Sequence, residues 1–165
     1  MQECDLFSNA EKAADAILKK ITAAGLKLAL AESCTAGLGS ALLAGIPGAS
    51  SALWGSYVCY TKEAKISMLG IEREKIITYD LVSSETASLM VNGALLKSGA
   101  DIAAAVTGLA GPDSDGGKSP VGTVWVAAAR KDGVSKIREF HFKGSRNEIR
   151  IQAVIAVFEC INALT

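Results

Sequence analysis

The sequence LALAESCTAG, residues 28–37, is the stretch from which we interpret the whole chain. It passes from an apolar run into an acidic residue, three small polar residues and a glycine, the order expected where a strand ends and a helix begins. Ser33, Cys34 and Thr35 are short polar side chains that can cap the unpaired N–H groups of a helix's first turn. We expect the chemistry at this junction, although helix capping alone would also explain these three residues.

Helices and strands are expected to alternate on both sides of this junction. Before it, apolar residues at helical spacing predict a helix over 8–24, and a short apolar run predicts a buried strand over 26–31. The elements predicted after it are a helix over 35–44, a strand over 52–60, a helix over 61–69, a charged link, a helix over 83–97 and a strand over 101–106.

The C-terminal part of the chain predicts an antiparallel hairpin followed by a helix. Two strand-like runs, 121–129 and 134–142, flank a Lys-Asp-Gly turn. Ser145 and Glu148 form an S-x-x-E capping box for a final apolar helix over 149–164. Helices alternating with strands, one hairpin included, predict an α/β fold: a three-layer α/β/α sandwich around a mixed sheet.

Length and composition predict one domain that spans residues 1–165, because half of the residues are hydrophobic and the core is large enough to need no staples. Lysine plus arginine equals aspartate plus glutamate at 17 each, so no net charge attracts nucleic acid or an anionic membrane. The expected partner is therefore a small molecule whose charge is met locally.

The cysteines and the apolar runs predict a protein of the reducing cytoplasm. Four scattered cysteines and a single histidine give neither zinc spacing nor a disulfide framework, so we expect no metal and no cofactor. The first ten residues are polar and acidic, and no apolar run approaches the roughly 20 residues that span a bilayer. We accordingly expect no signal peptide and no transmembrane helix.

A serine nucleophile in this chain would have to work without an imidazole. His141, the only histidine, falls inside a predicted hairpin strand, which argues against a Ser-His-Asp triad. Such a serine needs a lysine whose pKa is lowered by burial, or a tyrosine that links lysine to serine. Tyr60 ends a predicted strand and Lys65 lies about one turn into the next helix, so both could reach Ser33. A solvated lysine and a core tyrosine would explain the same two residues.

Other residues near the predicted strand ends have two interpretations each. Cys34 is a competing nucleophile or a buried structural thiol. Glu32 could orient Lys65 or a substrate hydroxyl, or simply complement a helix dipole. Gly108 and Gly111 in VTGLAGP let backbone N–H groups approach a ligand as an oxyanion hole or phosphate nest, or are ordinary turn glycines.

A phosphate site is predicted at the start of the last helix. Arg146 and Arg150 are four residues apart, which puts both side chains on one helix face beside the capped start at Ser145. Helix N–H groups and the forked donors of arginine both suit phosphate oxygens. Two solvated surface arginines are the alternative.

Taken together, AESCTAG, YTKEAK, VTGLAGP and PVGTVW resemble the CinA C-terminal domain family, the nicotinamide-nucleotide amidohydrolases, in order and spacing over nearly the whole chain. The resemblance implies a stand-alone domain that hydrolyses nicotinamide mononucleotide to nicotinate mononucleotide and ammonia without a metal. It also implies Ser33 as the nucleophile, assisted by Tyr60 and Lys65. A nucleotide-binding or regulatory domain without turnover is the alternative, and a homo-oligomer is compatible with either.

The expected substrate-binding residues are Glu32, Cys34, Thr35, Thr107, Gly108, Gly111, Arg146 and Arg150. Four positions depart from the family pattern: Ala36 and Ser56 replace glycines, Lys62 stands in a YTK sequence instead of YSN, and Ser119 precedes PVG where a lysine is usual. These departures leave Ser33, Tyr60 and Lys65 in place and bear on which nucleotide is preferred.

Overall fold

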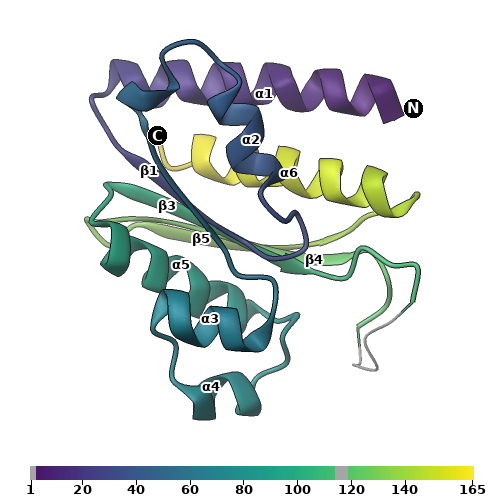
Figure 1. The fold of residues 1–165 in the computed structure, drawn as a ribbon. Helices are drawn as coiled ribbons and strands as arrows, with labels where there is room; N and C mark the ends of the chain where they lie inside the picture. The colour runs from purple at the N-terminus through teal and green to yellow at the C-terminus, as the bar shows by residue number, and fades with distance from the viewer. Residues whose placement is uncertain (1–2, 114–118) are drawn as a thin grey trace.

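The computed structural model describes residues 3–113 and 119–165, which pack around a single five-stranded sheet (Figure 1). The sequence also predicts a glycine-rich turn in GGKSPVG, residues 116–122, of which residues 116–118 lie outside the described part of the chain. The elements in chain order are α1 (Glu3–Ala23), β1 (Leu28–Glu32), α2 (Leu38–Ala44), a 3₁₀ helix (Ala49–Ser51), β2 (Leu53–Val58), α3 (Lys62–Leu69), α4 (Arg73–Thr78), α5 (Ser84–Ser98), β3 (Ile102–Gly108), β4 (Thr123–Arg130), β5 (Ser135–His141) and α6 (Arg146–Asn162).

The strand order of the sheet is β2-β1-β3-β4-β5. β1 pairs in parallel with both β2 and β3, whereas β4 is antiparallel to β3 and β5 is antiparallel to β4. The predicted mixed sheet with a C-terminal hairpin is confirmed. Because β1, β2 and β3 are parallel, the segments that follow them leave the sheet at one edge, and the crevice where strand order reverses is a common ligand site of such folds.

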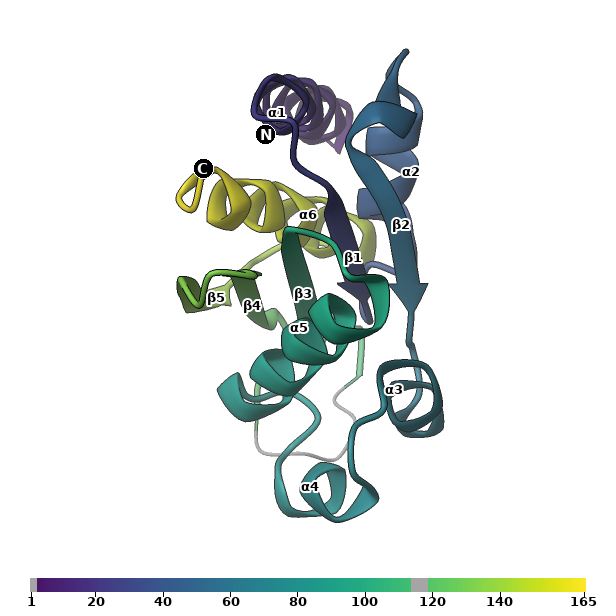
Figure 2. The same cartoon turned by 90° about the vertical axis from the view of Figure 1, so that its left-hand side faces the viewer.

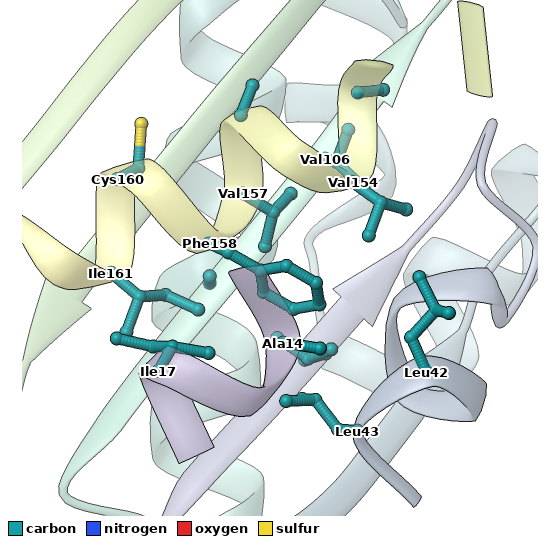
Figure 3. Close-up of a cluster of buried hydrophobic side chains, with 14 of the residues drawn as sticks. Ala14, Ile17, Leu42, Leu43, Val106, Val154, Val157, Phe158, Cys160 and Ile161 are labelled. Carbon is teal, nitrogen blue, oxygen red and sulfur yellow. The ribbon is translucent and has the colours of Figure 1, made fainter. Parts of the chain in front are cut away.

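Helices cover the two faces of this sheet, which confirms the three-layer sandwich. Figures 1 and 2 show α1, α2 and α6 on one side and α3, α4 and α5 on the other. Side chains alternate along each strand, so Leu28 and Leu30 of β1 join the first layer while Ala29 and Ala31 join the second. Figure 3 shows Phe158 of α6 within the first layer's core.

Most predicted elements are present, and the differences lie in the links. Thr61 and Ser83 cap α3 and α5 through their hydroxyls, as expected, and the Ser145–Glu148 capping box is complete at the start of α6. The link predicted after α3 is instead partly helical, because Ile76 of α4 is buried in the core against α3.

Candidate active site

A serine and a buried lysine contact each other at the carboxyl edge of the parallel strands. The Lys65 amine donates to Ser33 Oγ at 2.9 Å and to the Cys59 carbonyl at 3.0 Å. Lys65 is only 1% exposed, and no carboxylate of residues 3–113 and 119–165 pairs with it. Burial lowers the pKa of the Lys65 amine, because the charged form is poorly solvated there. The pair therefore joins a hydroxyl to an amine that gives up its proton more readily than a solvated lysine.

Local structure fixes both members of this pair. The amide of Ser33 donates to the Val106 carbonyl at 3.1 Å, which continues the β1–β3 pairing one residue beyond the strand. The Thr61 hydroxyl accepts from the Ala64 amide at 3.1 Å, so α3 begins at Lys62 and presents Lys65 one turn later. The predicted approach of Lys65 to Ser33 follows from these two anchors.

The cysteines beside the pair are poor nucleophiles. Burial raises the pKa of the Cys34 thiol to about 12 and that of the Cys59 thiol to about 11. Both thiols are protonated at neutral pH, and the thiol form is a much weaker nucleophile than the thiolate. Of the two predicted alternatives for Cys34, these values favour the buried structural thiol.

The turn after β1 differs from the sequence prediction. Residues 33–35 do not cap α2, which begins at Leu38 with Gly37 as its N-cap and no side-chain cap hydrogen bond there. The Glu32 carboxylate caps α2 instead, because it accepts hydrogen bonds from the Gly39 amide at 3.0 Å and the Ser40 amide at 2.9 Å. A carboxylate at the strand's end thus satisfies the first turn of the helix that follows.

The Glu32 carboxylate also accepts from two hydroxyls, that of Thr35 at 2.8 Å and that of Ser56 at 3.2 Å. Glu32 is 2% exposed and Thr35 is fully buried. Both residues shape the turn that carries Ser33 and neither lines the cavity at this edge of the sheet, so their contact with a substrate stays a prediction. Ser56, one of the departures from the family pattern, supplies one of these hydrogen bonds.

A cavity of about 260 Å³ opens at this edge of the sheet. Among its lining residues are most of the predicted site residues: Ser33, Cys34, Tyr60, Lys65, Thr107, Gly108, Gly111 and Arg146. The other lining residues were not predicted as site residues from the sequence: Leu81, Val82, Leu109, Ala110 and Asp113. Leu81 and Val82 come from the link before α5, where no motif or periodicity indicated a pocket wall.

Thr107 connects this missed wall to the sheet. Its hydroxyl donates to the Leu81 carbonyl at 2.7 Å, which holds the segment before α5 against the end of β3. Gly108, the next residue, has no room for a side chain, since a Cβ there would lie 2.7 Å from the Thr123 carbonyl oxygen. Thr107 and Gly108, the TG pair, thus shape the cavity: Thr107 through its hydrogen bond to Leu81, and Gly108 through its close packing against Thr123.

Arg146 lines the cavity, whereas Arg150 does not. One Arg146 N–H donates to the Tyr60 hydroxyl at 2.7 Å and another to the Gly111 carbonyl. Arg150 turns instead to the Thr35 carbonyl at 2.9 Å and to Asn147. Of the two arginines predicted to bind phosphate, the structure therefore places only Arg146 at the cavity, while Arg150 supports the turn after β1.

Tyr60 also departs from its predicted place between lysine and serine. Its hydroxyl is bonded to Arg146, its side chain is 53% exposed, and the lysine contacts the serine directly. Of the two arrangements considered from the sequence, the lysine with a lowered pKa matches this geometry.

Within residues 3–113 and 119–165, no group of three or more His, Cys, Asp or Glu side chains is placed to hold a metal ion. No helix in that part of the chain is both long and apolar enough to cross a membrane.

The fold and the site define a class: an α/β sandwich with a serine–lysine pair at the edge where its parallel strands end. The chain belongs to the CinA C-terminal domain family, whose model matches residues 10–165. A CinA-like protein of Syntrophomonas wolfei is 42% identical over 129 residues, and one of Geobacter metallireducens is 43% identical over 134. These alignments cover 78% and 81% of this chain but 31% and 32% of the relatives, so the chain spans about a third of their length.

Solved structures of the same superfamily share the fold over nearly their whole length. The competence/damage inducible protein CihA of Agrobacterium tumefaciens has a TM-score of 0.91 at 38% identity, covering 94% of this chain and 95% of that one. A CinA superfamily protein of Escherichia coli has a TM-score of 0.89 at 29% identity, covering 94% and 90%.

Proposed function

We propose that this domain hydrolyses the carboxamide of nicotinamide mononucleotide, giving nicotinate mononucleotide and ammonia. The observation that carries the proposal is the 2.9 Å contact between the Lys65 amine and Ser33 Oγ inside a cavity. The substrate follows from the sequence motifs shared with the nicotinamide-nucleotide amidohydrolases. The apolar wall of Leu81 and Val82 suits a pyridine ring, and Arg146 suits a phosphate.

In the proposed reaction, neutral Lys65 takes the proton of the Ser33 hydroxyl while Oγ forms a bond to the carboxamide carbon. The tetrahedral intermediate then breaks its C–N bond, and Lys65 returns the proton to the departing nitrogen, which leaves as ammonia. Water, deprotonated by the same amine, attacks the Ser33 ester, the bond between the acyl carbon and Oγ breaks, and Lys65 returns the proton to Oγ. The acid product leaves and loses its own proton to solvent. Each proton that Lys65 accepts is given back, so the enzyme returns to its starting state.

The backbone amide next to the proposed nucleophile is suited to stabilise the tetrahedral intermediate. Within the described part of the chain, the amide of Cys34 donates to no backbone acceptor, and Cys34 lines the cavity. The amide of the residue after a nucleophilic serine is a recurring oxyanion donor. Removal of one such donor typically costs about 10²–10³ in rate.

The test is ammonia release from nicotinamide mononucleotide by the unmodified chain, the Ser33→Ala variant and the Cys34→Ala variant. We expect Ser33→Ala to lower kcat by about 10⁴ or more, as for other covalent nucleophiles, while Cys34→Ala retains most of the activity. Thermal unfolding of each variant controls for loss of fold. A dead Cys34→Ala variant that remains folded would move the nucleophile to the thiol. Binding of the mononucleotide without ammonia release by the unmodified chain would favour the regulatory alternative.

A further inference from the structure

Two side chains from distant parts of the chain meet on the solvent side of the cavity. Tyr60 follows β2, and Arg146 is the first residue of α6. Both line the cavity, and the tyrosine hydroxyl accepts from an Arg146 N–H at 2.7 Å. A second Arg146 N–H donates to the Gly111 carbonyl, so the guanidinium is held from two directions.

The Arg146 guanidinium, although held by these two contacts, still has N–H donors and a positive charge available for a ligand. Arginine has five N–H donors, of which these two contacts occupy one on each terminal nitrogen. No carboxylate within residues 3–113 and 119–165 forms an ion pair with Arg146. A fixed and unneutralised fork is the arrangement that binds phosphate oxygens at the least cost in side-chain order.

The serine–lysine pair, in contrast, does not need Tyr60. Lys65 reaches Ser33 directly and is anchored to the Cys59 carbonyl. We propose that Tyr60 is a specificity-determining residue, which positions the Arg146 guanidinium for the substrate's phosphate and takes no part in proton transfer at Ser33. The choice of a mononucleotide ligand rests on the proposed function, whereas the contact between Tyr60 and Arg146 does not.

A binding experiment tests this inference without turnover. In the Ser33→Ala background, calorimetry would measure the Kd of nicotinamide mononucleotide and of nicotinamide riboside for Tyr60→Phe, Arg146→Ala and the double variant. Tyr60→Phe should weaken mononucleotide binding about five- to tenfold, the scale of one hydrogen bond, and riboside binding less than about twofold. With Arg146→Ala already present, Tyr60→Phe should add less than about twofold, because the two changes remove one interaction.

Three results would overturn the inference: equal weakening for both ligands, an undiminished effect of Tyr60→Phe without Arg146, or no mononucleotide binding at all. Tyr57→Phe is the matched control, since Tyr57 lies on β2 shortly before Tyr60, is outside the cavity lining and should leave both constants unchanged. If the binding results hold but the unmodified chain releases no ammonia, the proposed function fails and the inference stands.

Kinetics on the chain with Ser33 intact separate positioning from proton transfer. Tyr60→Phe should raise KM for the mononucleotide about five- to tenfold and leave the pH profile of kcat in place. A fall in kcat of about 100-fold or more, with KM unchanged, would make Tyr60 a proton carrier, as general acid–base groups contribute on that scale. That result would overturn the inference and leave the proposed function intact.

Discussion

Lys65 is the residue on which the proposed chemistry depends, and the environment of its amine predicts how kcat/KM changes with pH. Burial lowers its pKa, so the neutral amine that accepts a proton is populated at a lower pH than for a solvated lysine. We expect kcat/KM to rise with pH and to level off below the ordinary lysine value of 10.5. Rates of ammonia release between about pH 6 and 10 check this. A rate that falls as pH rises through this range would exclude Lys65 as the base.

Ala36 is a second residue with a specific consequence. Its φ of 51° is left-handed, in the turn that carries Ser33, where the family pattern has glycine. A side chain in that conformation costs about 1–2 kcal/mol, whereas glycine loses about 0.5–1 kcal/mol of chain entropy on folding. Ala36→Gly should therefore raise the free energy of unfolding by about 0.5–1 kcal/mol, measured in urea. Ala23→Gly, at an exposed helical position, should lower it, and equal losses at both sites would contradict the argument.

At this scale the sequence predicted the approach of Lys65 to Ser33 but not the partners of Glu32 or Tyr60. Ser33 and Lys65 could be placed because each follows the end of a parallel strand by a few residues. The Glu32 carboxylate meets Ser56, 24 residues away, and Tyr60 meets Arg146, 86 residues away. Such contacts depend on side-chain directions that local patterns do not encode.

Among the elements, α2 depends on the strand before it. The Glu32 carboxylate accepts four hydrogen bonds and satisfies the first turn of α2 from a buried position. Glu32→Gln would replace one accepting oxygen by an NH₂ group, which would face the hydroxyl and amide donors that the carboxylate now accepts from. We expect the free energy of unfolding to fall by about 2–4 kcal/mol. Urea unfolding measures this, with Glu159→Gln on the exposed side of α6 as the control. Equal stability of the two variants would mean that the carboxylate does not hold the turn.

The packing of α3 against α5 positions Lys65. A Cβ on Gly93 of α5 would lie 2.6 Å from the Leu69 carbonyl oxygen at the end of α3. Gly93→Ala should push the two helices apart, lower stability by about 1–3 kcal/mol and reduce kcat, because α3 carries Lys65. The control is Asn92→Ala, at an exposed position of α5. A fully active and stable Gly93→Ala variant would show that the helices do not need this approach.

Element types were largely predictable from periodicity and caps, and links were not. Helix starts were predictable at Thr61, Ser83 and Ser145, because the hydrogen bonds that cap a helix involve only nearby residues. The helix α4 was missed because Ile76 is its single buried residue, and one buried residue gives no helical period. The cavity wall at Leu81 and Val82 was missed for the same reason: tertiary contact, not local pattern, determines it.

For the whole molecule, topology explains why the site forms where it does. Three parallel strands end at one edge of the sheet (Figure 2). Ser33 and Tyr60 follow β1 and β2, and Thr107 and Gly108 are the last residues of β3. The N-terminus of α6 then brings Arg146 to the same cavity from the far end of the sequence. The order of helices and strands was enough to predict that Ser33, Tyr60 and Lys65 lie at one end of the sheet, whereas the position of Arg146 at the cavity and the turning away of Arg150 needed the packed structure.

The central claim is that Ser33 forms an ester with the substrate's acyl group, and trapping with hydroxylamine tests it most directly. Hydroxylamine competes with water for such an ester, so ammonia release from nicotinamide mononucleotide should be accompanied by the corresponding hydroxamate. The account predicts that the hydroxamate fraction rises with hydroxylamine concentration, persists in Cys34→Ala and disappears in Ser33→Ala. Ammonia release without any hydroxamate, or hydroxamate formed by Ser33→Ala at the same rate, would contradict it.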